Sequence, residues 1–210
     1  YKTELDSVGT FLSNVPINPY ISLHKTEFHS NLYFTAFGIH VNTVKVSRDN
    51  FTSFNLFYDF GQPIDAFKIA AHDTAFMYVL LSNSEIKKST DGGISWNSIT
   101  PSSAVSNGQT NITDITLGND PLEIWAAYGN FQNSAKVLKS IDGGLSWTNI
   151  TSANLPLTPV TQIVYQRGTM GGVYIAFAGQ SGVWYRNDSL AQWEALGSGL
   201  PMIGYLTNIY

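Results

Sequence analysis

The chain has 210 residues, 43% of them hydrophobic and 12% charged, which is long enough to bury a sizeable core and excludes wholesale disorder. Its formal net charge is −4, and its eleven Lys and Arg residues are scattered, with Lys87 and Lys88 as the one adjacent pair, so we expect no nucleic-acid partner. There is no Cys, which excludes disulfides and thiolate metal sites.

Aromatic residues make up 13% of the chain, and together with many Thr, Ile and Val residues they favour strands over helices. No apolar run approaches the ~20 residues that span a bilayer, so we expect no membrane insertion. The sequence opens at Tyr1 and shows no signal peptide. We therefore expect a processed mature form or a piece of a longer protein.

Four segments of the chain resemble one another, and they cover residues 32–50, 77–93, 124–144 and 173–189. Each has an apolar run that opens at or beside an aromatic residue, then a turn rich in Gly, Asn or Ser, and then an alternating run. An Asp follows two residues after a hydroxyl or basic residue. This pattern predicts a hairpin of two strands in every segment.

A further short strand is predicted ahead of each segment, and a fourth strand after each Asp-containing turn, as in 96–100 and 147–151. The leading strands have apolar anchors 44 to 48 residues apart, at Leu23, Phe67, Ile115, Ile163 and Ile209. Four short antiparallel strands in about 46 residues are typical of a β-propeller blade. A β-sandwich also has short strands, but it does not repeat one turn at a fixed period.

We therefore predict an all-β fold, a β-propeller built of four-stranded antiparallel blades. It forms a single domain over residues 1–210 or part of a larger one. The approximate blades are 20–58, 63–100, 110–151 and 158–197. Residues 1–14 and 203–210 fit strands of flanking blades, so the remaining blades of a larger propeller are an expected partner.

The segment from Ser89 to Trp96 reads STDGGISW, and the segment from Ser140 to Trp147 reads SIDGGLSW. They resemble the Asp box, or BNR repeat, of the sialidase, xyloglucanase, sortilin-type and photosynthetic assembly-factor propellers. Degenerate copies read SRDNFTSF from Ser47 and RNDSLAQW up to Trp193. The positions expected to be structural are Ser47, Asp49, Ser89, Asp91, Gly93, Trp96, Ser140, Asp142, Gly144, Trp147, Asp188 and Trp193. The resemblance is specific for the fold and weak for function, because these families do not share one chemistry.

In such a turn a short Asp side chain accepts hydrogen bonds from nearby amides, and the glycines permit positive φ. The Trp then opens the fourth strand and buries ~150–250 Å². The alternative is a pair of catalytic carboxylates or a cation site. Paired glycosidase carboxyls lie roughly 5–10 Å apart, whereas equivalent residues of different blades lie around a ring. The resemblance also implies that the box lies on the face away from a substrate site.

We therefore look for a binding site on the opposite face, among the loops that join strand two to strand three and strand four to the next strand one. The notable residues expected there are Asp59, Asp65, Asp114, Glu123, Tyr128, Asn130, Phe131, Gln132 and Gln180, with Tyr165 and Tyr205 nearby. The candidate binding face is Asp65, Asp114, Tyr128, Asn130, Phe131 and Gln132. Within it, residues 128–132 (YGNFQ) offer a platform for stacking a sugar, and Asp114 points into a central channel or has a structural role.

Known chemistries fit this set poorly. Sialidases clamp a carboxylate with three arginines, but Arg48 and Arg186 lie in or beside boxes, which leaves Arg167 alone. The four His residues lack metal-ligand spacing, so we expect no metal and no cofactor. A xyloglucanase-like enzyme needs paired acids in a cleft, and the early motif of that family is not recognisable here.

The leading hypothesis is a non-catalytic propeller module of a secreted or cell-surface protein, of bacterial origin, that presents loops to a protein or glycan ligand. The alternative is a fragment of an extracellular glycoside hydrolase, xyloglucanase-like in the first place and sialidase-like in the second. A third hypothesis is an assembly scaffold.

Overall fold

In the computed structural model the described residues are 21–25, 33–37, 42–47, 53, 56–179 and 182–196. Contacts divide the chain into two compact units, residues 1–64 and 65–210. All regular elements among the described residues are β-strands, and they form four four-stranded sheets. The all-β prediction is therefore confirmed, whereas the predicted flanking strands within 1–14 and 203–210 lie outside the described residues.

The first unit contains one sheet, whose strands follow one another in chain order. They are β1 (Ile21–Lys25), β2 (Tyr33–Phe37), β3 (Thr43–Ser47) and β4 (Leu56–Asp59). The last residue of β3, Ser47, pairs with Tyr33 at the start of β2. Asp49, which was expected to follow in the turn, lies outside the described residues.

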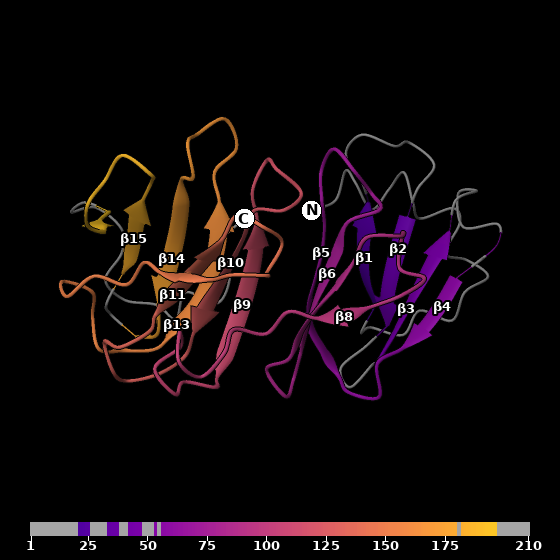
Figure 1. Ribbon diagram of the computed structural model, residues 1–210, viewed down its shortest axis with the longest axis horizontal. Helices are drawn as coiled ribbons and strands as arrows, with labels where there is room; N and C mark the ends of the chain where they lie inside the picture. Colours follow the sequence, from indigo (N-terminus) through magenta and orange to yellow (C-terminus); the bar gives the residue numbers. More distant parts are fainter. Residues whose placement is uncertain are drawn as a thin grey trace. The chain divides into compact units, whose positions relative to one another are not determined.

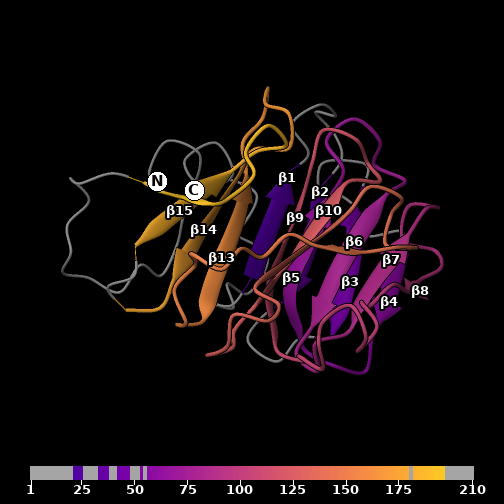
Figure 2. The same ribbon diagram turned by 60° about the vertical axis from the view of Figure 1, so that its left-hand side comes forward.

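The other three sheets repeat the same order (Figures 1 and 2). The second sheet has β5 (Ile64–Ile69), β6 (Met77–Leu81), β7 (Ile86–Ser89) and β8 (Asn97–Ser98). The third has β9 (Ile112–Leu117), β10 (Ile124–Tyr128), β11 (Val137–Ser140) and β12 (Thr148–Asn149). The fourth has β13 (Val160–Tyr165), β14 (Val173–Phe177), β15 (Val183–Arg186) and β16 (Glu194–Ala195).

The strand β10 shows why the apolar runs form the middle of each sheet. All five of its residues are buried. Successive side chains of a strand point to opposite faces. Ile124, Ala126 and Tyr128 accordingly join a core shared with the second sheet, whereas Trp125 and Ala127 join a core shared with the fourth. A sheet that is covered on both faces needs a continuous apolar run, which is what residues 124–128 supply.

Side chains of β9 tie it to β13, the first strand of the next sheet. Asp114 Oδ2 accepts a hydrogen bond from the Ile163 amide at 3.1 Å, and its Oδ1 accepts one from the Ile115 amide at 2.8 Å. Thr116 Oγ1 accepts a hydrogen bond from the Tyr165 amide at 3.2 Å. These side chains therefore satisfy amides at the edge of β13, a strand that belongs to a different sheet.

In the second, third and fourth sheets, a backbone hydrogen bond joins the turn after the first strand to the turn after the third strand, which lie at the same end of the sheet. The amides of Gly92, Gly143 and Asp188 donate to the carbonyls of Ala75, Leu122 and Met170, at 3.0, 2.8 and 2.9 Å. We call this end, with the turns after strands one and three of each sheet, the turn face. The other end, with the turns after the second strands and the connectors 99–111 and 150–159, is the loop face.

Replacement of Asp114 by Ala is expected to lower the free energy of unfolding by about 1.5–3 kcal/mol, because the amides of Ile115 and Ile163 lose a charged acceptor. Asp114→Asn keeps one carbonyl acceptor and is expected to lose less. The matched control is Asp65→Ala, an exposed acid for which a change within about 0.5 kcal/mol is expected. Urea unfolding measures all three, and equal effects of the two Ala variants would contradict the structural role of Asp114.

Candidate functional site

The turn from Ser89 to Trp96 is closed by its own side chains. Asp91 Oδ1 accepts hydrogen bonds from the amides of Ile94 and Ser95 at 3.0 and 2.9 Å, and Oδ2 accepts one from Ser95 Oγ at 2.6 Å. Ser89 Oγ donates to Asp91 Oδ1 at 2.7 Å and accepts from the Gly93 amide at 2.8 Å. Hydrogen bonds to the ionised carboxylate, those from Ser95 first, lower the pKa of Asp91 to about 2.

The turn from Ser140 to Trp147 repeats this geometry. Ser140 Oγ donates to Asp142 Oδ1 and accepts from the Gly144 amide, both at 2.8 Å. Asp142 accepts hydrogen bonds from the amide and hydroxyl of Ser146 at 2.9 and 2.5 Å. Gly144 has φ of 88°, and a Cβ added there would lie 2.7 Å from Ile99, so both conformation and space require glycine.

Two of the turn tryptophans join neighbouring sheets. The indole of Trp147 donates to the Ile99 carbonyl at 3.0 Å, and that of Trp193 donates to the Ile150 carbonyl at 2.9 Å. Each acceptor lies just after the last strand of the preceding sheet. The indole of Trp96 donates instead to the carbonyl of Gly93, at 3.0 Å. The tryptophans thus supply polar as well as apolar contacts.

Asp188 departs from the geometry of the other two turns. Its two oxygens accept hydrogen bonds from Lys139 Nζ at 2.7 and 2.9 Å, so the carboxylate reaches the third sheet. Asn187 closes the local turn, because its Oδ1 accepts from the Ser189 amide at 2.9 Å. The physical reason lies in the sequence: Arg186 and Gln192 stand where the other two turns have the Ser hydroxyls that bind the Asp.

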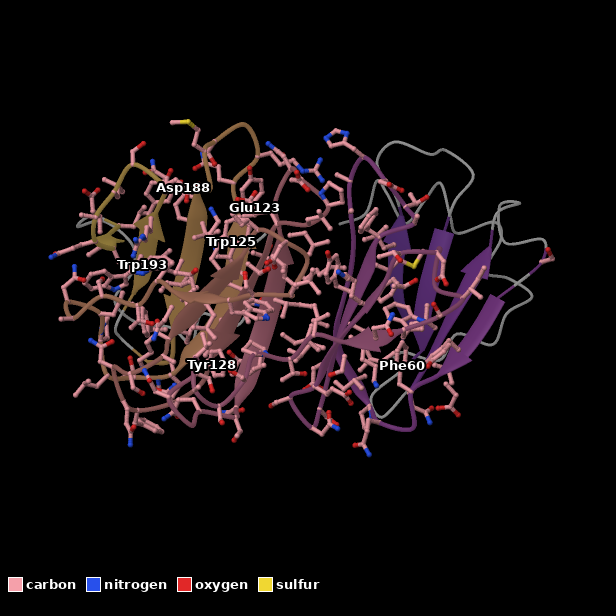
Figure 3. All side chains as sticks on the ribbon, in the orientation of Figure 1. Phe60, Glu123, Trp125, Tyr128, Asp188 and Trp193 are labelled. Atoms are coloured by element: carbon pink, nitrogen blue, oxygen red, sulfur yellow. The ribbon has the colours of Figure 1, made fainter. Side chains whose placement is uncertain are left out.

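Two residues expected on the loop face lie on the turn face instead. Glu123 comes directly before β10, which starts at the turn face, and Tyr165 is the last residue of β13, which ends there. Figure 3 shows Glu123 and Asp188 at one end of the sheets and Tyr128 at the other. The predictions for Glu123 and Tyr165 were therefore wrong, since the direction of each strand decides at which face its end lies. Arg167, in the turn after β13, also lies on the turn face.

Glu123 and Asp188 share one cation. Lys139 Nζ lies 3.0 Å from Glu123 Oε1 and 5.0 Å from the centroid of the Trp125 ring. Burial alone would lower the pKa of Lys139, but the hydrogen bonds and charges of Asp188 and Glu123 outweigh it and raise the pKa. The Trp125 ring in turn stacks on Tyr165 at 5.4 Å. The cluster therefore connects the third and fourth sheets by charge and aromatic packing.

The predicted platform of residues 128–132 is smaller than expected. Tyr128 is 1% exposed, because it points into the core between the second and third sheets. Asn130 is also buried, donates to the Ala135 carbonyl at 2.7 Å and accepts from the Gln132 amide at 3.0 Å. Phe131 is 74% exposed and Gln132 is exposed as well. Phe131 and Gln132 are thus the part of this loop that is open to a ligand.

Lys136 was not expected to matter, yet it is fully buried on the loop face. Its Nζ donates to the carbonyls of Asn130, Leu157 and Thr158, the last at 2.7 Å. Burial lowers its pKa to about 8. The sequence signal is a Lys within the apolar run Ala135 to Leu138. The ammonium group joins the loop after β10 to the connector before β13.

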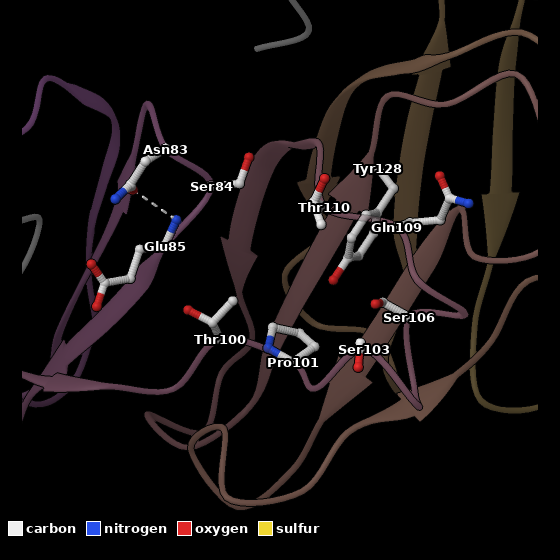
Figure 4. Close-up of a pocket in the computed structure, with 10 residues that line it drawn as sticks. All are labelled: Asn83, Ser84, Glu85, Thr100, Pro101, Ser103, Ser106, Gln109, Thr110 and Tyr128. Atoms are coloured by element: carbon white, nitrogen blue, oxygen red, sulfur yellow. Dashed lines mark hydrogen bonds between the residues drawn. The ribbon is translucent and has the colours of Figure 1, made fainter.

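The loop face also has a hollow of about 280 Å³ between the second and third sheets, shown in Figure 4. Its lining combines the turn after β6, the connector that follows β8, and the last residue of β10, and most of these residues carry a hydroxyl or amide group. The lining residues are Asn83, Ser84, Glu85, Thr100, Pro101, Ser103, Ser106, Gln109, Thr110 and Tyr128. No pattern in the sequence indicated it, because its two walls lie in separate repeats.

In the described part of the chain, no cluster of three or more His, Asp or Glu side chains is placed to hold a metal ion. The same residues include no helix with the length and hydropathy of a membrane span.

No protein-family model and no curated protein matches this sequence. Solved structures do resemble it. The GH74 xyloglucanase from Xanthomonas campestris superposes with a TM-score of 0.61 at 15% identity, over 82% of this chain and 30% of its own. YCF48 from Cyanidioschyzon merolae gives a TM-score of 0.59 at 13% identity, over 85% of this chain and 56% of its own. The fold is that of a β-propeller.

A structure of YCF48 bound to D1 peptide is similar too, with a TM-score of 0.52 at 12% identity, over 83% of this chain and 57% of its own. The chain thus spans less than two thirds of each of these proteins. At such identities the likeness concerns the fold, so each four-stranded sheet is a propeller blade and the chemistry has to be argued from the site.

Ser140→Ala is expected to lower the free energy of unfolding by about 1–3 kcal/mol, because the buried Gly144 amide loses its acceptor. Ser134→Ala is the matched control, since Ser134 Oγ is buried without a hydrogen-bond partner among the described residues. Its removal is expected to change stability by less than about 0.5 kcal/mol or to increase it. Chemical denaturation compares the two variants. Equal losses would show that the hydrogen bonds of Ser140 do not stabilise the turn.

The stability of the protein is expected to depend on Lys136 at alkaline pH. The ordinary pKa of 10.5 applies in the unfolded chain, so between pH 8 and 10.5 the unfolded state binds more protons and stability rises with pH. Lys136→Met removes this contribution, on the order of 3 kcal/mol across the window. The measurement is the free energy of unfolding of both proteins from pH 7 to 10.5. A difference between them that does not change with pH would contradict the shifted pKa.

Proposed function

We propose that this chain is a non-catalytic Asp-box propeller module of a larger secreted or cell-surface protein, of bacterial origin, and that its loop face binds a protein or glycan ligand. The observation that carries the proposal is how the acids are used. Asp91, Asp142 and Asp114 each accept hydrogen bonds from backbone amides. Carboxylates bound in this way order turns and strands.

The two full turns support the Asp-box assignment. Both have the order Ser-x-Asp-x-Gly-x-Ser-Trp. In both, the Ser hydroxyl bridges the Asp carboxylate and the amide of the second glycine. The same residues at the same spacing thus make the same bonds twice, which is what a repeated structural fastener requires.

The loop face supports binding because its loops are held in place before any ligand arrives. Asn107 Nδ2 donates to the Ser134 carbonyl and Asn111 Nδ2 donates to the Gly129 carbonyl, both at 2.8 Å. Asn133 Nδ2 donates to the Ser152 carbonyl at 3.1 Å. A preorganised surface loses little conformational entropy on binding. The exposed Phe131 ring gives this surface an aromatic contact for a ligand.

The similar proteins point to two classes of ligand, a protein and a glycan. YCF48 has been solved with D1 peptide bound, which is consistent with a protein partner and with the assembly-scaffold hypothesis. The likeness to a GH74 xyloglucanase favours a glycan, and it keeps a glycoside hydrolase fragment as the second candidate. The exposed Asp65, near the start of β5 at the loop face, is the acid that this second candidate would use.

The test measures both ligand binding and glucan hydrolysis by the 210-residue chain. Binding to glycan and peptide arrays is expected to fall about tenfold in Phe131→Ala, because an aromatic stacking contact is lost. The matched control is Leu145→Ala, which removes an equally exposed apolar side chain, 83% exposed, from the turn face. No hydrolysis of xyloglucan or β-glucan is expected. Hydrolysis that disappears in Asp65→Asn, or binding that depends on Leu145 and not on Phe131, would overturn the proposal.

A further inference from the structure

The hollow on the loop face has rigid walls. On one side, Ser84 has φ of 64°, and its Oγ accepts a hydrogen bond from the Ile112 amide at 3.1 Å, which joins the turn after β6 to the third blade. On the other side, the Gly108 amide donates to the Ser103 carbonyl at 2.8 Å within the connector. Gln109 Nε2 also donates to Gln132 Oε1 at 3.3 Å. Hydrogen bonds within the protein therefore hold the walls of the hollow, as is usual for binding pockets.

Two hydroxyl groups lie at the bottom of the hollow. Ser106 is 1% exposed, and among the described residues its Oγ has only a long or bent hydrogen bond with the neighbouring Tyr128 hydroxyl. Beside it, the Tyr128 hydroxyl points into the hollow while its ring is buried in the core (Figure 4). A buried hydroxyl with so poor a partner is unfavourable, since it has lost its hydrogen bonds to water. A ligand that carries a hydroxyl group would restore them.

The rest of the lining indicates a neutral ligand. Glu85 is its only charged residue, and the carboxylate is paired with Lys87 at 2.9 Å. The other side chains carry hydroxyl or amide groups, except for Pro101. Hydroxyls and amides both donate and accept hydrogen bonds. A sugar ring has the complementary pattern, with hydroxyl groups that donate and accept and C–H faces that pack on apolar surface.

An exposed aromatic residue also lies on the loop face. Gln109 lines the hollow and is hydrogen-bonded to Gln132, and Phe131 precedes Gln132 in the chain. The exposed Phe131 is therefore the chain neighbour of a residue that is bonded to the lining. The volume of about 280 Å³ is near the lower limit of ligand pockets, ~300 Å³, which suits one ring and not a long chain.

We propose that this hollow between the second and third blades binds one neutral sugar ring, with Ser106 and Tyr128 as hydrogen-bonding partners and Phe131 in contact with the adjoining residue of the glycan. The inference rests on the proposed function, since it names the ligand class and the site on the same face.

The experiment uses saturation-transfer NMR and titration of the 210-residue chain with glucose, galactose, mannose, xylose, cellobiose, lactose and xylobiose. Sialyllactose and glucuronic acid serve as charged probes. At least one neutral sugar is expected to bind, and Tyr128→Phe and Ser106→Ala are expected to weaken its binding about tenfold each. Ser134→Ala removes a buried, unpartnered hydroxyl outside the hollow and is expected to leave binding unchanged.

A further variant keeps the test valid if Tyr128→Phe or Ser106→Ala fails to fold. Ser103 is an exposed residue of the wall, so Ser103→Trp fills the hollow without entering the core and is expected to abolish binding. Phe131→Ala is expected to weaken the binding of disaccharides more than that of monosaccharides. Thermal melting confirms that each variant is folded.

The outcomes separate the inference from the proposed function. If no neutral sugar binds at ~50 mM, if only the charged probes bind, or if binding is insensitive to Ser103→Trp and Tyr128→Phe, the inference is wrong. The proposed function survives these results as long as Phe131→Ala reduces binding of a peptide or another glycan. The proposed function itself would be overturned if no substitution on the loop face changed the binding of any ligand, or if the chain showed hydrolysis that depends on Asp65.

Discussion

The structure depends on the burial of both faces of its middle strands. β10 presents alternate side chains to the cores that the third blade shares with the second and with the fourth. A blade in this position cannot be stable alone, because each of its faces needs a neighbour. Hydrogen bonds from the indoles of Trp147 and Trp193 and from the amide of Ile163 then join one blade to the next, and the described strands of these blades belong to separate sheets.

This constraint explains why the acidic turns are structural. In the second and third blades, the turn after the third strand leads into a fourth strand of two residues. The amides of this turn lie outside the strands and need other hydrogen-bond acceptors. The carboxylates of Asp91 and Asp142 are those partners. In the fourth blade both hydroxyls that complete this arrangement are missing, and Asp188 pairs with Lys139 of the third blade instead. An acid that is not needed by its own turn thus becomes a contact between blades.

The loops of the loop face differ in length from blade to blade. Residues 82–85 connect β6 and β7, whereas the longer segment 129–136 connects β10 and β11. The longer loop is held by the buried ammonium group of Lys136, and the connector beside it forms one wall of the hollow. A short turn next to a long connector leaves space between two blades, and this space has the hydroxyl-rich lining from which we infer sugar binding.

The sequence by itself determined the propeller fold, because apolar runs, turn residues and a period of about 46 residues are local features that repeat. It also indicated the turn residues around Asp91 and Asp142, whose bonds stay within eight residues. Only the tertiary structure decided that Tyr128 is buried, that Glu123 lies on the turn face, and that a hollow forms beside Ser106. These properties depend on contacts between blades, and the residues that meet there are too far apart in the sequence for a local pattern to connect them.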